Sequence, residues 1–183
     1  MNGRIAAVID GGPCQIGLES TVVGIEGGEI VIYRPGGTTK EALSAIAPTT
    51  VDSALAKEGA HPKAPGMKYR HYAPSAPLTV YTGEAGKVAE EIFSFAEKTD
   101  KKYGFFVSEE TARLLPKGLP VFVWGHREDK ESFAHNLFSG LLYFNRHPVD
   151  AIIGEGTDTA GLGLAIMNRL TKASGYHIVV EKR

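Results

Sequence analysis

Hydrophobic and polar positions follow a regular rhythm in residues 76–183, where short apolar runs alternate with longer segments that are apolar at every third or fourth position. The runs predict five strands and the periodic segments predict four helices. We expect strands at 77–81, 103–107, 120–124, 149–153 and 177–180, and helices at 84–98, 109–115, 129–146 and 160–173. The alternation indicates a three-layer α/β domain with a mostly parallel sheet. Ligands of such sheets bind at the carboxyl ends of the strands, so the loops after Tyr81, Val107, Trp124 and Ile153 are the first places to search.

Residues 1–50 have a different pattern, which is rich in β-branched residues and turns. We expect strands at 5–9, 21–25 and 30–33, with a hairpin turn at Gly27–Gly28. Thr38 or Thr39 caps a short helix through Ile46, which has Glu41 near its start. Two or three strands cannot close a core by themselves. Either residues 76–183 or a part of the protein absent from this chain should therefore cover them.

Residues 51–75 connect these two regions. Pro62, Pro65 and Pro74 predict a stiff, extended segment, because proline fixes φ and favours extended geometry in the residue before it. The segment also carries cations and aromatic rings that suit an anion and a flat ring: Lys68, Tyr69, Arg70, His71 and Tyr72. The alternative is an ordered linker whose aromatic side chains pack on one domain.

Composition narrows the range of functions. The chain has 20 basic and 21 acidic residues, so its net charge of −1 gives no overall attraction to nucleic acid or to anionic membranes. Cys14 is the single cysteine, which excludes an internal disulfide and suits the reducing cytoplasm. The six histidines show no His-x-x-x-His spacing, so we expect no metal site. No apolar run reaches 18 residues, so we expect no membrane span.

Three short motifs could bind an anion. Ser20 and Thr21 stand where a glycine-containing loop enters a strand, and their hydroxyls could donate to phosphate oxygens. Arg34 ends a strand before a rigid Pro-Gly turn, which could present its guanidinium to phosphate or carboxylate. The segment 154–163 follows a strand and opens a helix, where backbone amides favour an anion. The alternatives are a simple turn, an exposed arginine, and a glycine-rich contact between helix and sheet. The segment 154–163 does not match the dinucleotide or Walker fingerprints.

Four ordered motifs resemble one family. They are Asp-Gly-Gly-Pro-Cys at 10–14 with Gly-Leu-Glu-Ser-Thr-Val-Val at 17–23, then Tyr-Arg-Pro-Gly at 33–36, Pro-Gly-Met-Lys-Tyr-Arg-His-Tyr-Ala-Pro at 65–74, and Gly-Leu-Gly-Leu-Ala-Ile-Met-Asn-Arg-Leu at 161–170 followed by Lys172-Ala173. Together they resemble the C-terminal portion of the Sua5/YrdC family, the threonylcarbamoyl-AMP synthases. The resemblance covers nearly the whole chain.

The resemblance implies a domain organisation and a reaction. Residues 1–50 would be the β-rich end of a YrdC-type α/β catalytic domain, 51–75 the linker, and 76–183 a Rossmann-like Sua5 domain. The family condenses threonine, bicarbonate and ATP, with magnesium, into threonylcarbamoyl-AMP and pyrophosphate, and this product serves the t6A modification of tRNA. Ser20, Thr21 and Arg34 would contact ATP. Lys68, Tyr69, Arg70, His71 and Tyr72 would belong to a lid that the linker folds over the cavity. We expect no tightly bound cofactor.

The chain also departs from the family pattern, because the Lys-x-Arg and Ser-x-Asn-type motifs of the catalytic domain are absent and Gly24 replaces a usual acidic residue. We therefore expect a C-terminal fragment that is inactive alone, whether it is a shortened gene product, an excised piece or one half of a split protein with a separate YrdC domain. Exposed strand edges could also produce a homodimer. One alternative is a non-catalytic regulatory module that binds nucleotide, tRNA or protein. A third is a small nucleotide hydrolase that uses the 154–163 loop.

Overall fold

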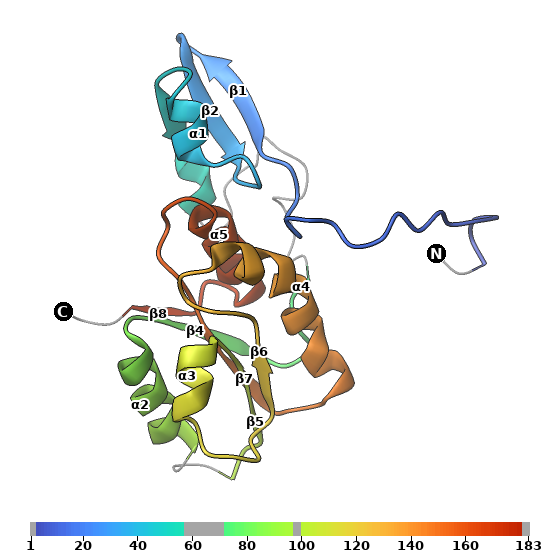
Figure 1. Cartoon of the computed structure of the whole chain (residues 1–183), viewed down its shortest axis with the longest axis vertical. Coiled ribbons are helices and arrows are strands. Elements are labelled where there is room, and N and C mark those ends of the chain that lie inside the picture. The colour runs from blue at the N-terminus through green and yellow to red at the C-terminus, as the bar shows by residue number, and fades with distance from the viewer. Residues whose placement is uncertain (1–2, 57–71, 97–99, 181–183) are drawn as a thin grey trace.

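The computed structural model describes residues 3–56, 72–96 and 100–180 of the 183-residue chain. These residues form a small three-stranded sheet near one end of the molecule and a larger five-stranded α/β unit toward the other (Figure 1). The small sheet and its neighbours comprise β1 (Val22–Glu26), β2 (Glu29–Arg34), α1 (Lys40–Ser44), β3 (Thr49–Val51) and the 3-10 turn η1 (Ser53–Ala56).

The small sheet is built around a hairpin. Strands β1 and β2 are antiparallel, and β2 pairs with β3 in parallel. Gly27 and Gly28 form the turn with φ angles of +59° and +86°, which suits a two-residue hairpin turn that favours glycine. Thr39 caps α1, because its side chain accepts a hydrogen bond from the Ala42 amide. The expected hairpin and the Thr39 cap are thus both present.

Two details of this region differ from the sequence expectation. The predicted strand at 5–9 is wrong, because this segment forms no strand and Ile5, Val8 and Ile9 are all exposed. The apolar run has no partner strand in the described residues, and without one an extended segment gains no ladder hydrogen bonds. Strand β3 was not predicted, because three residues carry too little pattern to distinguish a strand from a loop.

The larger unit alternates strands and helices, and its sheet is entirely parallel in the order β6-β5-β7-β4-β8. This confirms the predicted three-layer α/β architecture. Its elements are β4 (Leu78–Thr82), α2 (Ala85–Ala96), β5 (Tyr103–Val107), α3 (Glu109–Leu114), β6 (Val121–Val123), α4 (Lys130–Arg146), β7 (Ala151–Glu155), α5 (Gly163–Ala173) and β8 (Ile178–Val180). The helix expected to begin at residue 160 begins at Gly163 instead.

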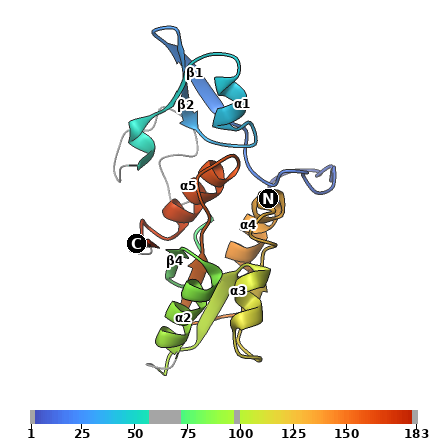
Figure 2. The ribbon, with the colours of Figure 1, turned by 60° about the vertical axis from the view of Figure 1, so that its left-hand side comes forward.

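Two apolar layers sandwich the sheet. Helices α4 and α5 pack on one face around Phe106, Trp124 and Ile166, and α2 and α3 pack on the other around Phe105 and Ile92 (Figure 2). Both layers contain side chains that are almost fully buried. Because α2 follows β4 and α5 follows β7, the helices that leave these two neighbouring strands run to opposite faces. The carboxyl ends of β4 and β7 therefore mark the switch point of the sheet.

Within the described ranges, no helix is long and apolar enough to cross a bilayer. The same ranges contain no group of three histidine, cysteine, aspartate or glutamate side chains that could hold a metal ion.

Candidate functional site

Ser20, Thr21 and Arg34 lie together at the open end of the β1–β2 hairpin. Arg34 donates from Nε to the Ser20 carbonyl over 3.1 Å and from Nη2 to Ser20 Oγ over 3.0 Å. The hairpin register explains this contact, because Arg34 pairs with Val22, only two residues from Ser20. The structure thus brings together Arg34 and the Ser20–Thr21 pair, which belong to two separate sequence motifs.

Thr21 holds the neighbouring loop. Its hydroxyl donates to the Thr38 carbonyl over 2.7 Å and accepts from the Thr38 amide over 3.1 Å. Gly36 packs directly on the same strand entrance, where an added Cβ would lie 2.1 Å from the Glu19 carbonyl oxygen and 2.5 Å from the Thr21 amide nitrogen. The segments 19–21 and 34–38 are therefore fastened to each other by hydrogen bonds and by close backbone contact.

Helix α5 of the larger unit reaches this site. Arg169 donates from Nε to Glu19 Oε2 over 2.9 Å and from Nη2 to the Pro35 carbonyl over 3.0 Å. The Arg169 side chain is only 9% exposed. In the sequence, Arg169 stands out only as part of the 161–170 motif, and no local pattern indicates a partner 150 residues away.

The charges around Glu19 perturb one another. Burial opposes ionisation of Glu19, but the charge and hydrogen bond of Arg169 outweigh it and lower the pKa of this carboxyl. Burial also lowers the pKa of Lys172 to about 8, and the positive charges of Arg169 and Arg34 add to this effect. Three cationic side chains thus gather around one carboxylate next to Ser20, which makes the site electropositive.

The predicted lid lies mostly beyond the described residues, since Lys68, Tyr69, Arg70 and His71 fall within 57–71. Tyr72 is described and is half-exposed. It has a φ of +59°, and its ring centroid lies 4.3 Å from that of Phe138 on α4. Tyr72 therefore contacts the larger unit, and the lid stays a prediction.

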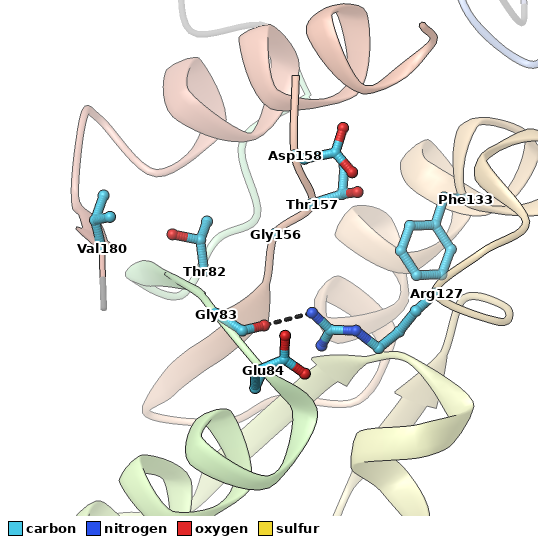
Figure 3. Close-up of a pocket in the computed structure, with 9 residues that line it drawn as sticks. All are labelled: Thr82, Gly83, Glu84, Arg127, Phe133, Gly156, Thr157, Asp158 and Val180. Carbon is cyan, nitrogen blue, oxygen red and sulfur yellow. Dashed lines mark hydrogen bonds between the residues drawn. The ribbon is translucent and has the colours of Figure 1, made fainter. Parts of the chain in front are cut away.

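A second candidate site is a crevice of about 580 Å³ at the switch point of the five-stranded sheet (Figure 3). Three of the four loops selected from the sequence contribute to it, namely those after β4, β6 and β7. Arg127 points from the loop after β6 toward Gly83, and its guanidinium donates to the Gly83 carbonyl. The crevice is lined by Thr82, Gly83, Glu84, Arg127, Phe133, Gly156, Thr157, Asp158 and Val180.

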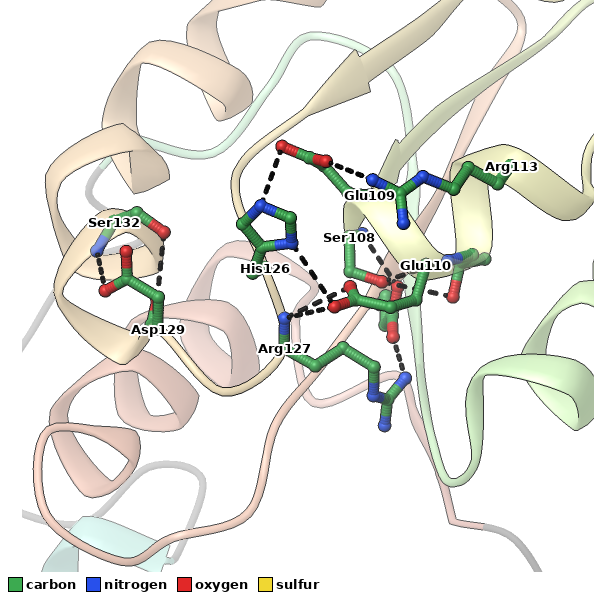
Figure 4. A network of polar contacts seen from close by, with 10 residues as sticks. Ser108, Glu109, Glu110, Arg113, His126, Arg127, Asp129 and Ser132 are labelled. Atoms are coloured by element: carbon green, nitrogen blue, oxygen red, sulfur yellow. Dashed lines mark hydrogen bonds and ion pairs between the residues drawn. The ribbon is translucent and has the colours of Figure 1, made fainter.

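A buried carboxylate fixes this arginine. Glu155 ends β7 and is fully buried, where it accepts hydrogen bonds from the Ser108 amide over 2.8 Å and from the Arg127 guanidinium. The Arg127 amide in turn donates to Glu110, whose carboxylate also lies 3.5 Å from His126 Nδ1 (Figure 4). A charged residue at the carboxyl end of an apolar strand was the one sequence signal for this network.

Asp158, in the loop 154–163, makes polar contacts with its own loop and with helix α4. Asp158 accepts from the Ala160 amide over 2.7 Å and pairs with Lys130 over 2.5 Å. An added Cβ on Gly156 would lie 2.7 Å from Thr82 Cγ2 and 2.9 Å from Met167 Sδ. The glycine therefore allows helix α5 and the sheet to approach closely, in line with the packing alternative given for this motif.

Comparison with known proteins identifies the family. The sequence model of the Sua5_C family, described as "Threonylcarbamoyl-AMP synthase, C-terminal domain", matches residues 38–175. The chain belongs to this family. The match covers every strand and helix of the five-stranded unit up to Gly175, together with α1, β3 and the end of the 34–38 loop.

Individual relatives extend the similarity to nearly the whole chain. A threonylcarbamoyl-AMP synthase of Bacillus subtilis is 40% identical over 180 residues, which are 98% of this chain and 51% of the relative. One of Pyrococcus abyssi is 41% identical over 190 aligned positions, which cover 97% of this chain and 52% of the relative. The crystal structure of P. abyssi Sua5 complexed with L-threonine superposes with a TM-score of 0.82 at 39% identity, over 98% of this chain and 52% of that one. The chain thus spans about half the length of the relatives that it matches.

Proposed function

We propose that this chain supplies the C-terminal half of a threonylcarbamoyl-AMP synthase, which condenses threonine, bicarbonate and ATP into threonylcarbamoyl-AMP and pyrophosphate. The observation that carries the proposal is the similarity over nearly the whole chain to proteins of that name, one of which was crystallised with L-threonine. The product would reach tRNA only indirectly, as the precursor of the t6A modification. A cytoplasmic location follows from this role.

The proposed organisation assigns residues 1–50 to the end of a YrdC-type catalytic domain, 51–75 to the linker and 76–183 to the Sua5 domain. The two separate sheets support a division into two units, and β3, the last strand of the small sheet, crosses the proposed boundary at residue 50. The small sheet leaves Val23 and Ile25 of β1 and the nearby Ile46 exposed, as expected of a sheet that further chain completes. We propose that a YrdC portion, joined to this chain or supplied as a second polypeptide, provides that cover.

Ser20 and Arg34 are the proposed contacts to the phosphates of ATP, which enters as its magnesium complex. In the reaction, threonine and bicarbonate first form threonylcarbamate with loss of water. An oxygen of its carbamate group then attacks the α-phosphorus, and pyrophosphate leaves with the electrons of the broken P–O bond. Such a transfer depends on positioning and on stabilising the negative charge that develops on the phosphoryl oxygens. Arg34 suits this role because it is already oriented by Ser20, and the cations of α5 raise the local positive potential.

The test uses the complete enzyme, in which this chain's sequence follows or is mixed with a YrdC portion. Arg34→Met should raise the KM for ATP at least tenfold, because a charge-assisted contact to phosphate contributes about 1.5–3 kcal/mol. Arg113→Met is the matched control, since Arg113 is exposed on α3 and pairs only with Glu109 among the described ion pairs. Equal KM values for the two variants would remove Arg34 from the ATP site.

A second candidate is a non-catalytic module that binds a small molecule and regulates a catalytic domain. The switch-point crevice favours it, because α/β sheets bind ligands there and the crevice presents both an oriented arginine and threonine hydroxyls. Calorimetric titration of this chain with ATP tests the idea. Binding that Thr82→Val weakens would support it, whereas heats that the substitution does not change would place any binding elsewhere.

A further inference from the structure

Arg169 holds both sides of the Ser20–Arg34 pair. Its partner Glu19 immediately precedes Ser20, and its partner Pro35 immediately follows Arg34. One guanidinium on α5 of the five-stranded unit thus joins two loops of the small sheet at the two positions that flank the proposed ATP contacts. Asn168, next to Arg169 on the same helix, accepts a third hydrogen bond from Nη1 over 2.8 Å and helps to orient the guanidinium.

A contribution to the free energy of folding explains the buried Arg169–Glu19 pair poorly. Removing a charged pair from water carries a desolvation cost that frequently equals or exceeds its Coulombic gain, so an apolar contact would join the two parts at least as well. The guanidinium instead gives direction, because its planar fork fixes the angle between the carboxylate on one loop and the carbonyl on the other. Such directional hydrogen bonds are useful where the positions of nearby side chains, here Ser20 and Arg34, must be fixed.

Further contacts join the two parts, among them the side chain of Leu18, which packs against the apolar core of the larger unit. The Gly161 amide donates to Glu41 Oε1 over 3.2 Å near the start of α1. Gly17 packs against the backbone of α4, where an added Cβ would lie 2.6 Å from the Cα of His135. The Gly161–Glu41 and Gly17–α4 contacts hold the small sheet against the larger unit. They do not involve Glu19 or Pro35, the residues adjacent to Ser20 and Arg34. They therefore supply controls for simple loss of docking.

We propose that Arg169 is a positioning residue, through which the Sua5 domain holds Ser20 and Arg34 in the geometry that receives ATP. The inference rests on the proposed function for the identity of the ligand. It gives the Sua5 domain a defined part in the reaction: Arg169 fixes the distance between the 19–21 and 34–38 loops. Any movement of α5 relative to the small sheet then changes the ATP site directly.

The mechanical part of the proposal is tested on the 183-residue chain by amide hydrogen exchange. Arg169→Met should accelerate exchange at least tenfold in residues 19–22 and 34–38 and leave β4, β5 and β7 unchanged. Glu41→Met, which removes the acceptor of another contact between the two parts, should leave the exchange of residues 19–22 and 34–38 at its original rate. Glu19→Gln keeps the side-chain length and should reproduce a smaller part of the acceleration if Arg169→Met fails to fold. Unchanged loops in the foldable variants, or equal acceleration throughout the chain, would overturn the proposal.

The functional part is tested in the complete enzyme. Arg169→Met should raise the KM for ATP at least tenfold, and Arg169→Lys should recover part of the loss because a lysine can reach one of the two partners. A merely destabilised enzyme would lose maximal rate at an unchanged KM for ATP, and that result would contradict the proposal. If the enzyme with Arg169 intact makes no threonylcarbamoyl-AMP, the proposed function fails instead, and the hydrogen-exchange result still decides whether Arg169 holds the loops.

Discussion

Replacement of Arg127 by methionine should strongly destabilise the five-stranded unit, because it leaves the Glu155 carboxylate without its ionic partner. Glu155 is fully buried, and only the Ser108 amide would remain among its described hydrogen-bond donors. Removing one partner of a buried pair costs about 3–5 kcal/mol. Arg127 is 27% exposed beside the crevice, so water can partly replace it, and we expect a loss near the lower end, about 3 kcal/mol. A loss of this size lowers the melting temperature by about 6–12 °C in a chain of this length.

Thermal and urea unfolding at pH 7 measure this loss, with the exposed Arg113→Met as the matched control, which should change stability by no more than about 0.5 kcal/mol. The double variant Arg127→Met with Glu155→Gln should recover at least half of the loss, because glutamine still accepts from the Ser108 amide and carries no charge. An Arg127→Met variant as stable as the Arg113 control would refute the reasoning. So would a double variant no more stable than the single one.

Two further stability measurements test the contacts around α4 and α5. Gly17→Ala should lower the free energy of unfolding by about 1–3 kcal/mol, because Gly17 has a φ of +72° and its added Cβ would meet the α4 backbone. Gly11→Ala is the control, since nothing lies within 4 Å of the new Cβ. Equal stability of the two variants would contradict this prediction. The Lys172 pKa of about 8 lies below its ordinary value of 10.5, so the unfolded chain binds more protons than the folded one between these values, and the stability of the native chain rises with pH there. The free energy of unfolding of Lys172→Met should therefore exceed that of the native chain by most below pH 8, and this difference should shrink as the pH rises toward 10. A difference that does not change with pH would contradict the burial of this ammonium group.

The architecture of residues 76–183 could be predicted because each element carries its own local pattern. Apolar runs such as 103–107 and the periodic stripe of α4 need no distant information to be assigned. Capping residues also mark boundaries, as Ser108 does for α3, where its side chain accepts from the Thr111 amide. The segment 5–9 differs, because an apolar run becomes a strand only when a partner strand lies beside it.

The contacts of the candidate sites also fall into two kinds, those that follow from local sequence and those that join distant elements. The adjacency of Ser20 and Arg34 follows from a hairpin register that a glycine turn fixes over a few residues. The contacts of Arg169 with Glu19 and of Arg127 with Glu155 join residues 150 and 28 positions apart, and the relative placement of whole elements decides them. The one local sign of these pairings in the sequence is Glu155, a charged residue at the end of an apolar strand.

The most direct test of the account is the release of pyrophosphate from ATP that depends on both threonine and bicarbonate. We predict none from the purified 183-residue chain, and we predict release together with threonylcarbamoyl-AMP once a YrdC portion is added or fused. Threonine-dependent release by the chain alone would contradict the account, and so would the absence of release from the combined protein.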